Sequence, residues 1–353
     1  MSDRYERLRL WVAGVLGSSD FELKPASSDA SFRRYWRLVH SSTTAILMDA
    51  PPAFEDCGRF ADLSRRFRSV GLNTPEVQAE DRANGFLMVT DFGDRVYLGE
   101  LRDGTADRLY GDAMSALAVI QACAPMDGLP SYDAPFIRRE LGLFQDWFLG
   151  SLLGLRLTET ESAALAAIDE RLVANAEEQP CVCVHRDYHS RNLMLIDAGN
   201  PGILDFQDAV VGPVTYDLVS LLRDCYIAWP ADRVTDWALG YFQLALQRGV
   251  LREHEPDGFL RWFDLMGVQR HLKACGIFAR LNLRDGKRHY LQDIPRTLGY
   301  VREVSGRYAE LDGLARLLEE RVLPGLDAVV DPPLAPCGDG RSLPGCGSRI
   351  APG

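Results

Sequence analysis

The stretch with the clearest chemical potential is "VHRDYHSRNLMLID", which is followed shortly by "ILDFQD". Asp187 and Asn192 stand five positions apart, and the turn signal "NPG" separates them from Asp205. A carboxylate beside a hydroxyl group can orient it and take its proton, while a carboxamide and a second carboxylate can hold a magnesium ion that bridges phosphate groups. A hairpin between Asn192 and Asp205 would bring these two ligands to one point. The spacing therefore predicts phosphoryl transfer, with Asp187 as catalytic base and Asn192 and Asp205 as metal ligands.

Single residues of this kind are common as surface charges or helix caps, and the tripeptide "HRD" alone often arises by chance. The ordered set of His185, Asp187, Asn192 and Asp205 stands between apolar strand residues and is much harder to explain in that way. We therefore interpret the set as functional, with His185 as structural support.

A second acidic motif, "TDFGD" at residues 90–94, precedes this set in the chain. In a kinase the loop that carries the base comes before the metal-binding aspartate, so Asp91 is in the wrong order to be the metal ligand. The motif also ends the last expected strand of a β-rich segment. We therefore assign it to a hinge between two lobes, where backbone groups of Thr90 to Phe92 would pair with the edge of an adenine base.

The combination of "HRDYHSRN", "LDFQD" and "GPVTYDL" resembles the aminoglycoside phosphotransferase and choline kinase branch of the kinase-like superfamily. The resemblance covers roughly residues 21–307 and implies a two-lobed fold that binds ATP and Mg²⁺ between the lobes. It also implies that Asp217 braces the catalytic loop, although a helix N-cap explains Asp217 as well. No long activation segment follows "LDFQD", which argues against a protein substrate.

A narrower resemblance rests on "SDASFRRYWRL", "AILMDAPP", "LMVTDFGD" and "QRHLKACGIFARLNLRDGKRHYLQDIPRTL". These segments are similar to the bacterial cell-wall sugar kinases of peptidoglycan recycling. The resemblance implies an ATP-dependent kinase that phosphorylates the anomeric C1 hydroxyl of N-acetylmuramate and N-acetylglucosamine.

Two other functions compete with this expectation. An aminoglycoside-type antibiotic phosphotransferase would share the motifs, but the basic stretch "RHLKACGIFAR" disfavours a cationic acceptor. A nucleotide-binding pseudokinase scaffold is suggested by the absence of a lysine in the third expected strand, "TAILMDAPP", where Leu47 or Met48 occupies the usual position. The complete set of Asp187, Asn192 and Asp205 argues against that scaffold.

The surrounding elements suit such a site. The runs "FELKPA", "FRRYWRLVH", "TAILMDAPP", "PEVQAED" and "FLMVTDF" predict an antiparallel set of five strands, and "FEDCGRFADLSRRF" predicts a helix. Beyond residue 93 the patterns are mostly helical, with a capping box expected at Thr158 and Glu161 and one β interruption around the catalytic motif.

The predicted fold class is therefore α+β, a bilobal protein-kinase-like fold. Residues 1–92 form a small antiparallel β-rich N-lobe that binds ATP, and residues 93–330 form a larger, mainly helical C-lobe for catalysis and acceptor binding. Residues 331–353 contain ten Pro or Gly among 23 residues and predict a flexible tail.

The first turn, "SSDAS", lacks the glycine-rich pattern of many nucleotide loops. Its small residues, including Ser28, Ala30 and Ser31, would let backbone N–H groups approach phosphates.

The cation that the third strand lacks is expected from Arg33 or Arg34 on the neighbouring strand. Adjacent strand residues point to opposite faces, so only one of the two can face the cleft. Glu55 or Asp56 would orient that arginine, unless both belong to a solvated helix face.

For the acceptor, the cations in an otherwise apolar helix are notable: Arg270, His271, Lys273 and Arg280. Burying several of them without partners would be costly. We single out Arg270 and Lys273, together with Asp187, as substrate-binding residues, because an arginine can hold a lactyl carboxylate through two hydrogen bonds. Ordinary salt bridges to the 50 acidic residues explain these cations as well.

The bulk properties exclude several other classes. The chain has 353 residues and a net charge of −11, which argues against a nucleic-acid binder. No signal peptide or transmembrane segment is evident, and the eight cysteines do not form paired CxxC motifs. We expect a reduced, cytoplasmic protein whose partner is a small-molecule amino sugar, without nucleic acid, membrane or an obligate protein partner.

Overall fold

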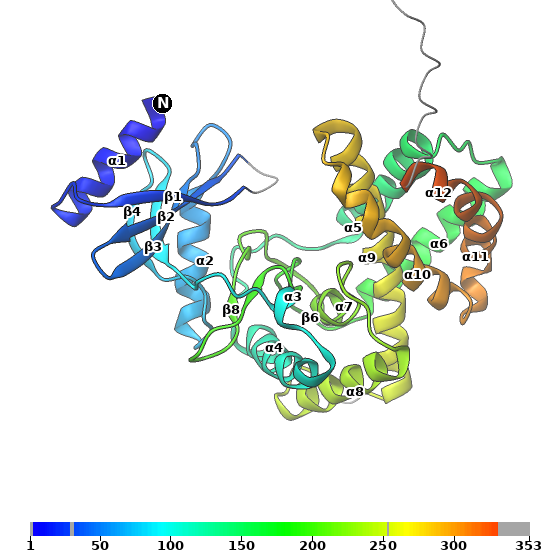
Figure 1. Cartoon of the computed structure of the whole chain (residues 1–353). Helices are drawn as coiled ribbons and strands as arrows, with labels where there is room; N and C mark the ends of the chain where they lie inside the picture. Colours follow the sequence, from blue (N-terminus) through cyan, green and yellow to red (C-terminus); the bar gives the residue numbers. More distant parts are fainter. Residues whose placement is uncertain (1–2, 29–31, 253, 331–353) are drawn as a thin grey trace, which may run out of the picture.

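The structure is a computed structural model that describes residues 3–28, 32–252 and 254–330 (Figure 1). Ala30 and Ser31 of the expected phosphate loop lie outside the described residues, as does the expected tail at residues 331–353. Ser28 is described as the last residue of a strand.

A five-stranded antiparallel sheet forms the first part of the chain, as predicted. Its order is β1-β2-β3-β5-β4. The strands are β1 (Glu22–Ser28), β2 (Arg34–His40), β3 (Thr43–Asp49), β4 (Val77–Asp81) and β5 (Phe86–Thr90). Gly85 (φ +72°) closes the β4–β5 hairpin, and a Cβ atom there would lie 1.9 Å from the Ala50 carbonyl oxygen. Only glycine fits at this point.

Two helices flank the sheet. The predicted helix is α2 (Cys57–Ser69), whose Phe60 and Phe67 join the main core of the molecule. Helix α1 (Asp3–Leu16) was not predicted, and it buries Leu8 and Val12 in a second apolar cluster on the other side of the sheet.

Strand alternation sorts the side chains of β2 and β3 between these two sides. Tyr35 pairs with Met48, and Arg37 pairs with Ile46. Met48 belongs to the main core, whereas Leu47 packs in the α1 cluster. Of the two residues expected in the place of a lysine, only Met48 therefore lies on the side of the main core.

The remainder of the described chain is mainly helical. Its α-helices are α3 (Tyr97–Glu100), α4 (Asp103–Cys123), α5 (Ala134–Leu143), α6 (Glu159–Glu177), α7 (Tyr216–Leu222), α8 (Ala231–Gln247), α9 (Pro256–Asp285), α10 (Ile294–Ser305), α11 (Asp312–Leu317) and α12 (Leu323–Val330). A π-helical segment, Phe144–Leu152, continues α5, a second, Leu318–Val322, joins α11 to α12, and two short 3₁₀ segments are Arg288–Asp293 and Ala309–Leu311. None of the described helices combines the length and apolarity needed to cross a membrane.

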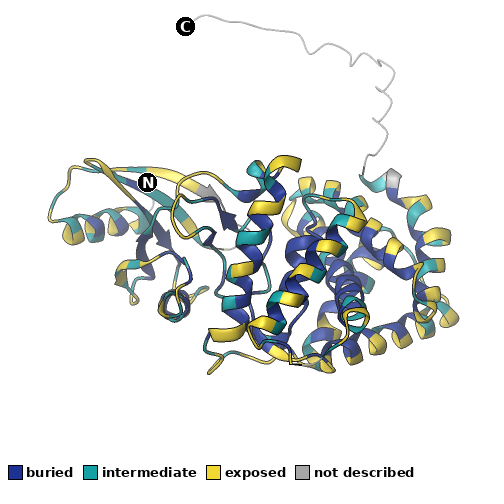
Figure 2. Ribbon diagram, turned by 90° about the horizontal axis from the view of Figure 1, so that it is seen from below, coloured by how far each residue is buried: buried dark blue, intermediate teal, exposed yellow. Residues whose placement is uncertain are grey.

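Helix α9 is the centre of this helical part, because α5, α6, α7, α8 and α10 all pack against it. Buried residues concentrate where these helices meet, and exposed residues line their outer faces (Figure 2). The predicted capping box at the start of α6 is confirmed: the Thr158 N–H donates to the Glu161 carboxylate (2.7 Å), and the Glu161 N–H donates to the Thr158 hydroxyl (3.2 Å).

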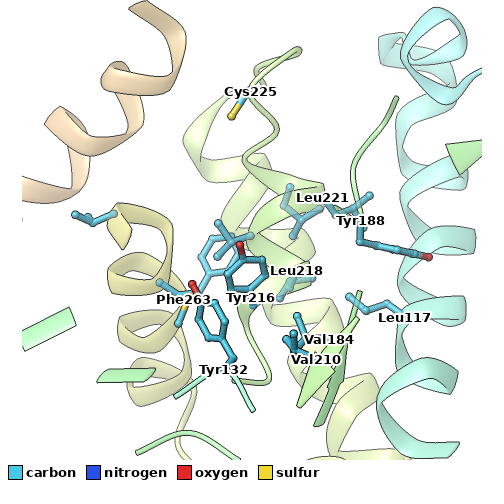
Figure 3. Close-up of a cluster of buried hydrophobic side chains, with 14 of the residues drawn as sticks. Leu117, Tyr132, Val184, Tyr188, Val210, Tyr216, Leu218, Leu221, Cys225 and Phe263 are labelled. Carbon is cyan, nitrogen blue, oxygen red and sulfur yellow. The ribbon is translucent and has the colours of Figure 1, made fainter. Parts of the chain in front are cut away.

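The β interruption consists of two small antiparallel pairs. β6 (Cys181–Val184) pairs with β9 (Val210–Pro213), and β7 (Leu193–Met194) pairs with β8 (Gly202–Ile203). Val184 of β6 and Val210 of β9 are buried in one apolar cluster with Tyr132, Tyr216 and Leu218 (Figure 3). This hairpin region lies between the five-stranded sheet and helices α9 to α12 (Figure 1).

Candidate active site

The loop between β6 and β7 is held by a buried aspartate from α7. The backbone N–H groups of His185 and Arg186 donate to the two carboxylate oxygens of Asp217, at 2.6 and 2.9 Å. Arg186 has φ +78°, an uncommon conformation for a residue with a side chain. Burial raises the pKa of Asp217 to about 7, while these two N–H donors favour its ionised form. Asp217 thus fixes the backbone directly before Asp187.

The structure brings Asp187, Asn192 and Asp205 together. The side-chain Nδ2 of Asn192 donates to the Asp187 carbonyl (3.0 Å) and lies 3.4 Å from Oδ2 of Asp205. Because Nδ2 is engaged in this way, the amide oxygen of Asn192 is the atom left to bind a metal. Asp205 has φ +61° and accepts a hydrogen bond from Gln207 (2.8 Å). One amide oxygen and one carboxylate suit Mg²⁺, which takes its remaining ligands from phosphates and water.

Opposing effects act on the carboxyl group of Asp187. Burial by itself would raise its pKa, but the positive charges of Lys273, Arg186 and Arg270 outweigh burial and hold the pKa below its ordinary value. The group is therefore a carboxylate at neutral pH, as an acceptor for a substrate hydroxyl must be.

His185 contacts the backbone of Asp187 and the ring of Tyr188 through its buried imidazole ring. Its Nδ1 accepts a hydrogen bond from the Asp187 N–H (3.3 Å), and its ring meets the Tyr188 ring edge-on at 5.5 Å. Burial lowers the pKa of His185 to about 4, so the imidazole is neutral.

A cleft of about 490 Å³ lies between the sheet and the β7–β8 hairpin. Apolar side chains of Ile46, Val89, Met194 and Leu204 line its walls, whereas Asn192 and Asp205 line its polar end. Apolar walls with a polar end suit a nucleotide, whose base and phosphates need these two environments.

Thr90 and Phe92 line this cleft, as the hinge hypothesis requires. The Thr90 N–H is already engaged, since it donates to the Glu76 carbonyl (3.0 Å). The Phe92 ring packs against Gly202 of β8, where a Cβ atom would lie 2.8 Å from the ring. Among these hinge groups, the Thr90 N–H is therefore excluded as a donor to adenine.

Asp91 of the "TDFGD" motif is bound by an arginine that the sequence analysis did not single out. Nε of Arg37 lies 2.7 Å from Oδ2 of Asp91, and Nη2 of Arg37 lies 2.8 Å from the Asp94 carboxylate. Asp91 also accepts a hydrogen bond from the Gly93 N–H (2.9 Å). These ion pairs thus join Arg37 of β2 to residues 91–94, which connect the sheet to the helical part.

Arg33, directly before β2, and Arg34, the first residue of β2, have different surroundings. Nε of Arg33 lies 3.5 Å from the Glu55 carboxylate, and Nη1 lies 3.9 Å from Oδ1 of Asp205. Arg34 is exposed and, by strand alternation, lies on the opposite side of β2. Asp56 caps α2 by accepting from the Gly58 N–H (2.9 Å). The geometry therefore associates Arg33 and Glu55, rather than Arg34 and Asp56, with Asp205.

The predicted acceptor residues Arg270 and Lys273 are buried in α9. Nζ of Lys273 lies 2.9 Å from Glu140 and donates to the Tyr216 hydroxyl (2.8 Å), whereas Nη1 of Arg270 donates to the Cys225 thiol (3.7 Å).

His271 and Arg280, the other cations noted in this helix, are not part of this arrangement. Nε2 of His271 is 2.8 Å from the Arg223 carbonyl, and its ring stacks on Tyr300. Arg280 lies further along α9 and is half-buried.

Besides Arg37, two further residues near the site were missed from the sequence. Glu140 of α5 accepts from the hydroxyl of Tyr132 (2.5 Å) and from Nη2 of Arg186 (2.7 Å). Arg191 lines the cleft and lies 3.5 Å from the centroid of the Tyr226 ring. The sequence signals are a glutamate among apolar helix residues and a basic residue directly before Asn192.

Comparison with known proteins gives two groups of relatives. Residues 22–256 match the model of the phosphotransferase enzyme family. The chain is 46% identical over 299 residues to an N-acetylmuramate/N-acetylglucosamine kinase of Pseudomonas putida, which covers 84% of this chain and 88% of the relative. It is 44% identical over 330 residues to a protein of the same name from Pseudomonas aeruginosa, covering 90% and 97% of the two chains.

Solved structures confirm the predicted kinase-like fold. An ADP-bound aminoglycoside phosphotransferase, APH(2'')-Ib, matches with a TM-score of 0.55 and 17% identity over 86% of this chain and 98% of that chain. An ethanolamine kinase of Plasmodium vivax matches with a TM-score of 0.62 and 9% identity over 84% and 87% of the two chains. At such identities the similarity establishes the fold alone.

Proposed function

The chain belongs to the phosphotransferase enzyme family, and from this premise we propose that it transfers the γ-phosphoryl group of ATP to the anomeric C1 hydroxyl of N-acetylmuramate and N-acetylglucosamine. The observation that carries the proposal is the identity of 41–46%, over most of the chain, to kinases named for these two amino sugars. The product is a sugar 1-phosphate, which would serve the recycling of cell-wall amino sugars.

The proposed reaction is a single displacement. Asp187 accepts a hydrogen bond from the sugar hydroxyl and orients its oxygen toward the γ-phosphorus. As the new P–O bond forms, the bond to the β-phosphate oxygen breaks, ADP departs and the hydroxyl proton passes to Asp187. An anomeric hydroxyl is more acidic than an ordinary alcohol, so a carboxylate whose pKa is lowered is a sufficient acceptor.

The nucleotide would place its base against the apolar walls of the cleft and its phosphates at Asn192 and Asp205. Magnesium, held by these two residues, would neutralise the phosphate charge. Arg33 supports the same end of the cleft, because it lies near Asp205 and is oriented by Glu55. We propose that Arg33 takes the phosphate-binding role of the missing lysine, since a guanidinium group can pair with two phosphate oxygens.

A rival acceptor class is the aminoglycosides, because such kinases share the fold. Aminoglycosides are polycations, and the acceptor side of this protein contains the buried cations Arg270 and Lys273. Like charges disfavour such an acceptor.

Phosphorus NMR of the purified protein with ATP and Mg²⁺ tests the proposal. N-acetylmuramate, N-acetylglucosamine and an aminoglycoside are supplied in separate reactions. We expect an anomeric sugar phosphate signal with the two amino sugars and none with the aminoglycoside. Phosphate transfer to the aminoglycoside alone, or to no acceptor while ATP still binds, would contradict the proposal.

A further inference from the structure

Two buried cations of α9, Arg270 and Lys273, lie on one face of the helix because they are three residues apart. Both are less than a tenth exposed, Arg270 at 7% and Lys273 at 8%. A cation this deeply buried needs compensation from a nearby anion or from several hydrogen-bond acceptors. Within the residues that the structure describes, the protein supplies such a compensating anion to Lys273 but not to Arg270.

Lys273 is fully compensated. Its ammonium group lies 2.9 Å from the Glu140 carboxylate and 2.8 Å from the Tyr216 hydroxyl. Burial alone would lower the pKa of Lys273, but Glu140 more than offsets this and holds the pKa above its ordinary value. Glu140 is in turn 2.7 Å from Arg186, the residue before Asp187. The ordinary salt-bridge explanation therefore accounts for Lys273.

Arg270 has no such partner in the described part of the chain, where no carboxylate lies within ion-pair distance of it. Nη1 of Arg270 donates to the Cys225 thiol, a weak acceptor, at 3.7 Å. The nearby carboxylate of Asp224 is committed elsewhere, since it accepts from the backbone N–H of Ser190 and of Tyr226, both at 3.0 Å. Among the described residues, the buried guanidinium of Arg270 thus has a weak thiol acceptor and no carboxylate partner.

Arg270 lies near Asp187, where the acceptor hydroxyl would bind. Its positive charge is among those that hold the pKa of Asp187 down, so the guanidinium is near enough to the Asp187 carboxylate to stabilise its charge. One helical turn away, Lys273 contacts Glu140, which binds the residue next to Asp187. A sugar whose C1 hydroxyl meets Asp187 would therefore extend toward Arg270.

N-acetylmuramate carries a lactyl ether with a carboxylate that N-acetylglucosamine lacks. We propose that Arg270 binds this lactyl carboxylate and thereby sets the preference of the enzyme for N-acetylmuramate, an inference that rests on the proposed function. The carboxylate supplies the anion that the protein does not provide, and the planar guanidinium presents two parallel donors to it.

The test compares kcat/KM for the two sugars in Arg270→Gln and Arg270→Lys. We expect the ratio of N-acetylmuramate to N-acetylglucosamine to fall by about 10- to 100-fold in Arg270→Gln, the effect of losing one charge-assisted pair. Arg270→Lys keeps the charge without the two-pronged geometry, so its ratio should be intermediate. Arg284→Gln, an exposed change in the last turn of α9, is the matched control and should leave the ratio unchanged.

A change in the substrate separates recognition from damage to the fold. The methyl ester of N-acetylmuramate keeps the lactyl group, removes its charge and adds one methyl group. The unmodified enzyme should lose about the same 10- to 100-fold with the ester, whereas Arg270→Gln should treat acid and ester alike.

The outcomes distinguish the two proposals. An equal loss for both sugars in Arg270→Gln, or an ester penalty that persists in this variant, would overturn the role of Arg270 and leave the amino sugar kinase intact. Failure of the unmodified enzyme to phosphorylate either sugar would overturn the proposed function itself.

Discussion

Asp187 shows how the charges around a residue decide its chemistry. Burial favours a neutral carboxyl group, and the surrounding cations more than reverse that preference. The result is an ionised group whose basicity is low, which suits a reaction in which positioning and charge neutralisation do most of the work.

Replacing Asp187 by asparagine is expected to lower kcat by about 10²- to 10⁴-fold, because the amide keeps the shape but accepts no proton. Binding of ATP should be nearly unchanged, since Asn192 and Asp205 remain. Steady-state kinetics and a nucleotide-binding titration measure the two effects. Asp197→Asn, in a fully exposed side chain on the β7–β8 loop, is the control and should behave as the unmodified enzyme. An Asp187→Asn enzyme with ordinary kcat would remove Asp187 from the proposed mechanism.

Arg33, directly before β2, and Arg34, its first residue, allow a closely matched comparison. Arg33→Gln is expected to raise the KM for ATP and lower kcat/KM by about 10- to 100-fold, because it removes a cation near Asp205. Arg34→Gln changes the same residue type one position later, on the other side of the strand, and should have little effect. Glu55→Gln should act in the same direction as Arg33→Gln but more weakly, since it only orients the arginine. Equal effects of Arg33→Gln and Arg34→Gln would contradict this assignment.

At the scale of single residues, the spacing predicted that Asp187, Asn192 and Asp205 would lie together, as the structure shows, while their catalytic and metal-binding roles stay predictions. Spacing was sufficient for Asp187, Asn192 and Asp205, because they lie on one short hairpin. The choice between Arg33 and Arg34 depends on the register of β2 against β3, which spacing does not reveal. Glu140 was missed because a single glutamate in a helix usually faces solvent.

Among the elements, α5, the catalytic loop and α9 are joined by one side chain. The carboxylate of Glu140 is 2.7 Å from Arg186 of the loop and 2.9 Å from Lys273 of α9. Burial alone would raise the pKa of Glu140, but Lys273 and Arg186 outweigh this and hold it below its ordinary value. The carboxylate therefore stays ionised at the junction of the three elements.

Glu140→Ala is expected to lower the free energy of unfolding by about 3–5 kcal/mol, because it leaves the buried Lys273 and the partly buried Arg186 without their anion. Urea denaturation measures this loss. Glu170→Ala is the control, since Glu170 also pairs with an arginine from α5, Arg138 at 2.6 Å, but on the exposed surface. The control should be far less destabilising. Similar losses in the two variants would show that the buried network has no special importance for stability.

The elements themselves were largely predictable, and the exceptions have physical reasons. The strands and the capped helix α6 follow from local patterns. Helix α1 was missed because the apolar surface that holds it belongs to Leu38, Leu47 and Phe86, which are contributed by distant strands. The π-helical continuation of α5 was not foreseen either, since local composition does not distinguish it from an ordinary helix.

The molecule as a whole assembles its site from distant segments. The cleft takes Ile46 from β3, the hinge from residues 90–94 and Asp205 from beyond β8. Motif spacing alone does not place these segments around one cavity. The family resemblance supplied that arrangement, and the structure adds the contacts that hold it, such as the ion pair of Arg37 with Asp91.

Stability of the whole chain against acid should depend on histidines that are buried in the neutral form. Burial and the positive charges of Arg270 and Arg223 lower the pKa of His271 to about 3. Between pH 6.5 and 3 the unfolded chain therefore binds a proton at this site that the folded chain does not, and stability falls as the pH falls. Asp217, whose pKa burial raises to about 7, acts in the opposite direction over part of this range. The contribution of His271 must therefore be measured as a difference between two proteins.

His271→Gln provides that difference. At pH 7.5 it should be destabilising, because it removes the hydrogen bond to the Arg223 carbonyl and the stacking on Tyr300. At pH 5 the free energy of unfolding of the unmodified protein is about 2 kcal/mol lower through His271, because its unfolded chain binds a proton there. Glutamine does not titrate, so the variant loses no stability in this way. The stability difference between the two proteins should therefore shrink or reverse at pH 5. Urea unfolding at both pH values measures it, with the exposed His289→Gln as control. If the stability difference between the two proteins stayed constant from pH 7.5 to 5, His271 would be protonated in the folded protein at pH 5. That result would contradict the lowered pKa of His271.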